Sequence, residues 1–258
     1  MITSKDNAKI KHARTLQIDS KSRREAGAFV VEGVRLVEEA LASGWPVQWL
    51  IYTDELDARG QKVLAGFSER GISIEQVTPQ VMRSASDTQT PQGLLAVLEA
   101  RSLPLPTALN FIFIPDSVRD PGNLGTMLRT AAAAGVQGVL LPPGSVDPFS
   151  PKVLRSSMGA HFRFPVYNLA WEEIRRIVWQ AGLKVYLAEA SGGEIYTNVD
   201  WGAPLALIVG GEAEGAGPDA QSLAIKRVLI PMPGGSESLN AASAAAVLLF
   251  EAVRQRTS

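Results

Sequence analysis

The sequence contains no cysteine and only two histidines, His12 and His161. A chain without thiols can form no disulfide, no thiolate zinc site and no cysteine nucleophile. Two histidines are too few for a histidine metal cluster, and they argue against a Ser-His-Asp triad. We therefore expect chemistry that requires no metal.

Long hydrophobic runs are also missing. No stretch approaches the roughly 20 apolar residues that a membrane-spanning helix requires. The first residues, MITSKDNAKIKHARTL, lack the apolar segment of a secretory signal. The composition, with 46% hydrophobic and 20% charged residues, is that of an ordinary globular protein. We expect a cytoplasmic protein without a membrane partner.

Excess charge of one sign is lacking overall, since the formal net charge is −1, but the first 24 residues are basic. Only Asp6 and Asp19 oppose seven basic residues there. Such a segment either follows a phosphate backbone or forms a solvated helix face. The candidate RNA contacts are Lys5, Lys9, Lys11, Arg14, Arg23 and Arg24.

Helix and strand patterns alternate along the whole chain. In the first part we expect strands at 28–33, 47–53, 72–78 and 93–100, and helices at 5–17 and 35–44. In the second part we expect strands at 110–115, 138–142, 184–190, 204–210 and 227–232, and helices at 122–134, 171–181 and 239–254. The proline-containing stretch RSLPLPTALN separates a domain at 1–103 from a domain at 108–258. Several second-part strands are continuous apolar runs, which predicts an α/β fold with a parallel sheet covered on both faces.

Three loops that follow these strands carry unusual residues. Ligands of open parallel sheets bind at the carboxyl ends of the strands, so these loops are the candidate site. The first, DSVRDPGNLGTMLRTA, contains Asn123 as a possible helix cap and Arg129 about one and a half turns further on. A capped helix with a surface arginine explains the same pattern. The loop matches neither the dinucleotide fingerprint G-x-G-x-x-G nor the Walker motif G-K-[ST], which argues against a nucleotide-binding dehydrogenase.

The second and third loops are rich in glycine. GGEAEGAGP (210–218) can present backbone groups to a flat ligand, although a flexible surface turn is the alternative. Its carboxylates, Glu212 and Glu214, would repel a phosphate. The third loop, IPMPGGSESLN, leaves a strand and leads into the last helix, with Ser238 or Asn240 at the helix start. Successive strand ends of this kind predict one shared pocket.

The three loops, taken in order, resemble the motifs of the SpoU/TrmH RNA 2′-O-ribose methyltransferases of the SPOUT superfamily. The motifs are N-x-G-x-x-x-R (Asn123, Gly125, Arg129), G-x-E-x-x-G (Gly210, Glu212, Gly215) and the stretch from Ile230 to Ala244. LRSSMGAHFRFPV (154–166) is similar to the segment between the first two motifs. In the first hundred residues, ITSKDNAKIKHARTL and FVVEGVRLVEEAL resemble the small substrate-binding domain of the family.

The resemblance implies S-adenosylmethionine as methyl donor, a ribose 2′-OH of RNA as acceptor, a deep trefoil knot and a homodimer. The implied cofactor-binding residues are Ala188, Gly210, Gly211, Gly215, Ile230, Met232, Ser238, Leu239 and Asn240. The implied catalytic residues are Arg129, Asn123, Glu212, Ser238 and Asn240. Arg129 acts either as the base or as a clamp on a neighbouring phosphate, and Ser238 either contacts the ligand or only caps a helix. His161 has no role beyond that of a loop residue.

Ribosomal RNA of the large subunit is the expected substrate, and transfer RNA is the alternative. A non-catalytic RNA-binding relative remains the competing hypothesis, and donor binding distinguishes the two.

Overall fold

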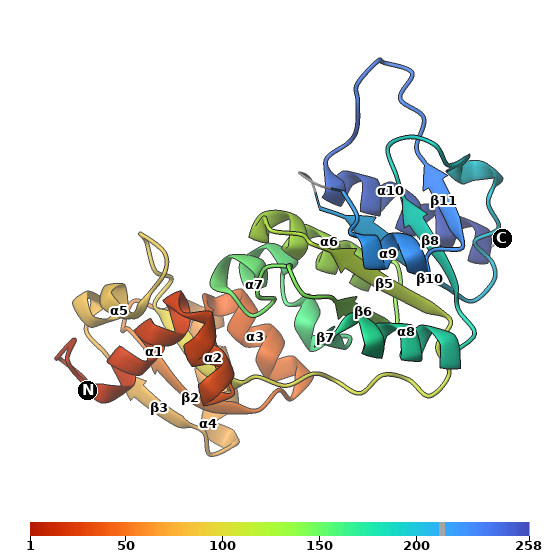
Figure 1. The fold of residues 1–258 in the computed structure, drawn as a ribbon. Helices are drawn as coiled ribbons and strands as arrows, with labels where there is room; N and C mark the ends of the chain where they lie inside the picture. The colour runs from red at the N-terminus through yellow and green to blue at the C-terminus, as the bar shows by residue number, and fades with distance from the viewer. Residues whose placement is uncertain (212–214, 258) are drawn as a thin grey trace. The chain divides into compact units, whose positions relative to one another are not determined.

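The computed structural model describes residues 1–211 and 215–257, which form two compact units (Figure 1). The first unit contains Met1–Arg101 and Phe149–Phe162, and the second contains Ser102–Pro148 and the chain from Arg163 onward. The boundary near residue 101 falls beside the proline-containing stretch, and residues 149–162 pack with the first unit. Within the described residues, every helix is too short or too polar to cross a membrane.

The first unit is built on a four-stranded sheet in the order β1-β4-β2-β3. The strands are β1 (Ala28–Glu32), β2 (Val47–Tyr52), β3 (Ser73–Gln76) and β4 (Leu94–Glu99). β4 is antiparallel to both of its neighbours, and β2 and β3 are parallel. The helices are α1 (Ala8–Ile18), α2 (Ser20–Ala26), α3 (Val34–Ser43), α4 (Ala58–Glu69), α5 (Pro79–Ala85) and α7 (Pro151–Ser157), followed by the short η1 (Ala160–Phe162). Residues of α1 and α5 form one apolar core with the sheet, which includes Ile10, Leu16 and Met82.

Residues 149–162 pack with the first unit through aromatic contacts and through an ion pair between Arg155 and Asp87. The ring of Phe149 lies 4.8 Å from that of Phe29 on β1, and the ring of Phe162 lies 5.1 Å from that of Trp45. His161 is buried beside Phe149, which agrees with a packing role. Burying such rings stabilises the attachment of this segment to the unit.

The second unit is built on a seven-stranded sheet in the order β7-β6-β5-β10-β8-β11-β9. The strands are β5 (Phe111–Asp116), β6 (Gly138–Leu141), β7 (Val166–Asn168), β8 (Lys184–Ala188), β9 (Glu194–Ile195), β10 (Leu205–Gly210) and β11 (Lys226–Leu229). All neighbouring pairs are parallel. The helices are α6 (Pro121–Ala133), α8 (Trp171–Gln180), α9 (Pro218–Leu223) and α10 (Ala241–Arg256), with the short η2 (Tyr196–Asn198).

Helices cover the parallel sheet because its strands are apolar on both faces. Ile174 and Val178 of α8 and Ala220 of α9 share a buried cluster with strand residues such as Ile112 and Ile208. α6 and α10 pack against each other, and α10 also contacts β10. The predicted α/β fold with a parallel sheet is therefore confirmed, whereas the trefoil knot stays a prediction.

The sequence patterns missed the 12-residue helix α4 and several shorter elements, among them α2, α5, α7, β7, β9 and α9. The strand expected at 227–232 ends at Leu229, and the last helix begins at Ala241 instead of 239. Pro231 and Pro233 lie between them, and proline can supply no N–H to a strand ladder.

Candidate functional site

A cavity of about 600 Å³ lies where three neighbouring strands of the second unit, β10, β8 and β11, end. These three strands are consecutive in the sheet and parallel, so their carboxyl ends meet at one edge. We name this the strand-end cavity. Its lining includes all nine residues predicted to bind the cofactor, which are Ala188, Gly210, Gly211, Gly215, Ile230, Met232, Ser238, Leu239 and Asn240.

Sequence reasoning missed part of the lining. Glu189, Ala190 and Ser191, which directly follow β8, and Gln221 on α9 also face the cavity. Glu189, Ala190 and Ser191 could have been predicted from their position directly after a strand, but their residue types match no motif. The Glu189 carboxylate lies 3.3 Å from Nη1 of Arg227, so the cavity wall contains an ion pair.

Two glycines of the loop after β10 allow its backbone to touch other chain segments. A Cβ at Gly211 would lie 2.3 Å from the carbonyl oxygen of Ser117, and one at Gly210 would lie 2.4 Å from the backbone nitrogen of Ala216. Real Cβ atoms do not approach backbone atoms this closely. These glycines are therefore required by close packing of the loop, whatever they contribute to a ligand.

A buried carboxylate links the first two motif loops. Asp116, at the end of β5, is 2% exposed and accepts a hydrogen bond of 2.7 Å from the backbone N–H of Gly217. It also accepts one of 3.1 Å from the hydroxyl of Ser117, whose φ of 56° is left-handed. Asp116 thus fixes the loops after β5 and β10 against each other, and sequence reasoning did not identify this role.

The start of α10 connects the third motif to the first. The side-chain oxygen of Asn240 accepts from the backbone N–H groups of Ala242 (3.0 Å) and Ser243 (3.2 Å), so Asn240 is the N-cap. Its amide nitrogen donates to Oδ1 of Asn123, at 3.1 Å. Ser238 is exposed and lines the cavity but does not cap this helix.

Asn123 does not cap α6, which corrects the expectation drawn from the first loop. The cap is Asp120, whose carboxylate accepts from the backbone N–H of Asn123 at 2.8 Å. Asn123 itself lies within the first turn of the helix. Pro121 precedes it at the first helical position, where proline needs no N–H partner, so the helix starts three residues earlier than an Asn123 cap would place it.

Arg129 lies on α6 and is exposed. Neither Arg129 nor Asn123 is among the described residues that line the strand-end cavity. Arg129 also has no hydrogen bond or ion pair to any residue that the structure describes, so its guanidinium is available to a substrate. Glu212, the remaining predicted catalytic residue, lies outside the described residues.

Most cations of the basic segment are engaged within the first unit. Lys9 pairs with Glu75, Lys11 lies 3.2 Å from Asp6, and Arg14 donates to the carbonyl of Ser84 at 2.9 Å.

Arg23 is only 5% exposed and donates to the carbonyls of Leu16 (2.6 Å) and Gln17 (3.3 Å). The prediction that Arg23 contacts phosphates is therefore wrong, because its guanidinium is buried against the backbone. Of the six candidates, Lys5 and Arg24 are exposed and have no partner among the described residues.

Two family models match the chain. The model of the SpoU rRNA Methylase family matches residues 110–250, and that of the MRM3-like substrate binding domain matches residues 7–96. The chain is 37% identical over 251 residues to the 23S rRNA (guanosine(2553)-2'-O)-methyltransferase RlmP of Bacillus subtilis (strain 168). That alignment covers 96% of this chain and 97% of the relative.

Solved structures agree over the whole length of the chain. The AdoMet-bound rRNA methyltransferase from Sinorhizobium meliloti superposes with a TM-score of 0.89 at 34% identity, covering 100% of this chain and 98% of that one. The SpoU methyltransferase AviRb from Streptomyces viridochromogenes, in complex with AdoMet, gives 0.86 at 30% identity, covering 98% and 99%. The motifs at the strand ends, the family models and these relatives together show that the chain belongs to the SpoU rRNA methylase family.

Proposed function

We propose that this protein transfers a methyl group from S-adenosylmethionine to a ribose 2′-OH of large-subunit ribosomal RNA. The observation that carries the proposal is the convergence of all nine predicted cofactor residues on one cavity, in a chain of this family. Transfer RNA is the weaker candidate. A solved structure described with 2-OH methylation of C/U34 on tRNA covers only 57% of this chain, whereas the rRNA methyltransferases cover nearly all of it.

The residues of the strand-end cavity fit S-adenosylmethionine. A volume of about 600 Å³ lies within the usual range for small-molecule sites. Ile230, Met232 and Leu239 offer apolar surface, while the backbone of Gly210 and Gly211 offers polar groups without obstructing side chains. When bound, the cofactor supplies a methyl group made transferable by its positively charged sulfur.

In-line displacement depends on how the acceptor hydroxyl is positioned, and Arg129 is the residue that we assign to this task. A guanidinium is not deprotonated in proteins, which favours a clamp on a neighbouring phosphate and stabilisation of the developing alkoxide over proton abstraction. The proton of the 2′-OH would then pass to solvent water. The planar fork of arginine suits the two oxygens of a phosphate. Asn123 and Asn240 hold the start of α6 next to the third motif and position this helix.

We further infer a homodimer in the cytoplasm. Phe250 on α10 is 48% exposed and Leu239 is 39% exposed, and contact with a second copy would bury such apolar surface. Light scattering with size-exclusion chromatography gives the mass directly; a monomer at micromolar concentration would contradict the inference.

The methyl-transfer reaction is tested with labelled S-adenosylmethionine and RNA from cells that lack this protein. Ribosomal and transfer RNA are supplied separately and then hydrolysed in alkali, which cannot cleave beside a 2′-O-methyl ribose. We expect label in an alkali-resistant dinucleotide from 23S rRNA. Label in transfer RNA alone would contradict the substrate assignment, and absence of both label and donor binding would support the non-catalytic hypothesis.

A further inference from the structure

A second cavity, of about 270 Å³, lies entirely within the first unit. Three chain segments line it: the end of β1 with the start of α3, the loop before β4, and the end of α7 with the residue that follows it. The lining residues that matter here are Glu32, Arg35 and Leu36, then Thr88, Thr90 and Gln92, then Arg155 and Met158. We propose that this first-unit cavity holds one unstacked nucleotide of the RNA substrate. The proposal rests on the proposed function and deepens it.

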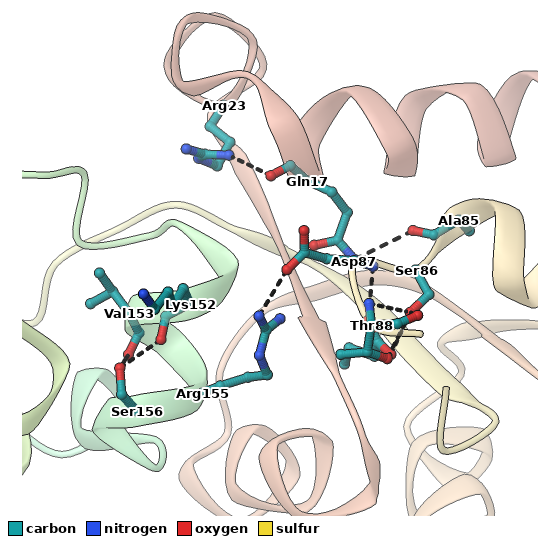
Figure 2. A network of polar contacts seen from close by, with 11 residues as sticks. Gln17, Arg23, Ala85, Ser86, Asp87, Thr88, Lys152, Val153, Arg155 and Ser156 are labelled. Carbon is teal, nitrogen blue, oxygen red and sulfur yellow. Dashed lines mark hydrogen bonds and ion pairs between the residues drawn. The ribbon is translucent and has the colours of Figure 1, made fainter. Parts of the chain in front are cut away.

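Polar contacts fix the walls of this cavity. The Glu32 carboxylate accepts from the hydroxyl of Ser86 at 2.5 Å, from the backbone N–H of Asp87 at 3.2 Å and from the hydroxyl of Thr88. Arg155 points from α7 toward Asp87, and its Nη2 lies 2.8 Å from the carboxylate (Figure 2). The carboxylate that lines the cavity, Glu32, and the neighbouring Asp87 thus already accept hydrogen bonds from other groups, which weakens their repulsion of a phosphate.

Other groups of the cavity remain available to a ligand. Arg35 is exposed and has no hydrogen bond or ion pair to another described residue. The side-chain oxygen of Gln92 accepts from the backbone N–H of Val34 at 3.2 Å, and its NH₂ group has no partner within the described part of the chain. The hydroxyl of Thr90 is exposed beside them. These groups can contact a phosphate, a base edge or a 2′-OH.

The remaining walls are apolar, and the size of the cavity suits a single nucleotide. Leu36 and Met158 supply surface against which a base can lie. Sequence-specific RNA recognition relies on single-stranded nucleotides whose bases are splayed out and bound along their edges. A volume of about 270 Å³ cannot admit a duplex, so the occupant is one nucleotide of a loop or bulge.

The first-unit cavity is a stronger candidate for RNA contact than the basic segment at the N-terminus, in which only Lys5 and Arg24 of the six candidate residues are exposed and without a partner among the described residues. Lys9, Lys11 and Arg14 are engaged with neighbouring groups, and Arg23 is buried. The first-unit cavity combines an exposed cation, Arg35, with an enclosed shape and hydrogen-bonding groups. Phosphate contacts give affinity, whereas contacts to a base give the choice of sequence.

Charge reversal at Arg35 tests the proposal in the full-length protein. Arg35→Glu is compared with Arg70→Glu, which changes net charge equally at an exposed arginine outside the cavity. The probe is 23S rRNA transcribed in vitro, with the RNA Kd from filter binding and the S-adenosylmethionine Kd from calorimetry. We expect Arg35→Glu to weaken RNA binding about tenfold or more, as is usual for loss of a specific arginine contact, with donor affinity unchanged. Equal RNA affinities for the two variants would overturn the proposal.

Filling the cavity gives a second, independent measurement. Thr90→Trp places a large ring at the mouth, whereas Thr90→Ser keeps the hydroxyl and serves as its control. We expect the tryptophan variant to raise KM for RNA about tenfold while kcat and KM for the donor stay unchanged. An RNA KM equal to that of Thr90→Ser would contradict the proposal.

Cross-linking with 4-thiouridine-substituted 23S rRNA locates the contact directly. Cross-links to peptides containing Arg35, Thr90 or Met158 are expected, and cross-links confined to residues 5–24 would overturn the proposal. Wild-type protein that methylates 23S rRNA while the variants behave normally would refute this inference alone. Wild-type protein that neither binds nor methylates 23S rRNA would refute the proposed function with it.

Discussion

The two cavities of this protein are built in different ways. The strand-end cavity is formed by glycine-containing loops after neighbouring parallel strands, and main-chain packing fixes its shape. The first-unit cavity is assembled from three distant segments that charged and hydroxyl side chains hold together. A cavity fixed by the main chain tolerates changes of side chain but not an added Cβ at its glycines. A cavity fixed by side chains fails when one donor or acceptor is removed.

The largest effect on kcat is expected from Arg129, which lies outside the strand-end cavity and is the residue assigned to position the acceptor hydroxyl. Arg129→Lys should lower kcat by about 100- to 1,000-fold, the usual cost of losing one stabilising donor at a developing charge. Donor affinity should not change, since Arg129 does not line the cavity. Arg176→Lys, at an exposed arginine on α8, is the control. A near wild-type kcat for Arg129→Lys would exclude both the base and the clamp.

A single methyl group should damage the main-chain cavity. Gly211→Ala forces a Cβ to within 2.3 Å of the Ser117 carbonyl oxygen, so one of the two loops must move. We expect a loss of about 1–3 kcal/mol in the free energy of unfolding, as in other overpacked sites, together with weaker donor binding. Gly234→Ala is the matched control because its Cβ would meet nothing within 4 Å. Equal donor affinity in the two variants would mean that the loops adjust freely.

Arg23 and Arg24 are adjacent, but Arg23 is buried and Arg24 is exposed, so their substitutions should differ in their effect on the free energy of unfolding. Arg23→Ala removes a buried donor to the carbonyls of Leu16 and Gln17, and should cost about 1–3 kcal/mol in urea unfolding. Arg24→Ala should change stability by less than about 0.5 kcal/mol, since Arg24 is exposed and without a partner among the described residues. Equal costs would show that Arg23 is not held as the structure indicates.

Two substitutions at Asn240 separate its cap from its link to Asn123. Asn240→Asp keeps the oxygen that accepts from the start of α10 but loses the amide donor to Asn123. Asn240→Ala loses both, and should cost about 1 kcal/mol of stability that the aspartate variant retains. We expect both variants to weaken donor binding in calorimetry. Normal binding by Asn240→Asp would show that the link is dispensable.

The smallest effect concerns the far end of α10. Hydrogen bonds from Arg254, and secondarily from Gln255, hold the pKa of the Glu251 carboxyl below its usual value. The stability that they give is present above the unfolded-state pKa of the carboxyl and is lost as pH falls through the lower folded-state pKa. Thermal melts should therefore show a smaller loss between neutral and strongly acidic pH for Glu251→Gln than for wild type. Parallel pH profiles would contradict this.

The sequence predicts the part of the strand-end cavity formed by the second and third loops because its determinants are local, whereas the first loop, which was expected to share the pocket, contributes no described lining residue. Each motif follows one apolar strand, and a parallel sheet brings successive strand ends to one edge. What could not be predicted depends on pairing between distant segments. The link between Asn123 and Asn240, the buried Asp116 and the burial of Arg23 all require the folded chain. Charge counts alone could not show that Lys9 and Lys11 are paired with carboxylates.

The placement of residues 149–162 has a practical consequence for dividing the protein. The chain leaves the first unit after Arg101, returns at Phe149 and leaves again after Phe162. A fragment that starts at residue 102 would carry Phe149 and Phe162 without Phe29 and Trp45, the rings against which they pack. Replacement of the first unit of this chain must therefore exchange two stretches of the gene, because a single junction would leave these apolar rings exposed on one product and a gap in the other.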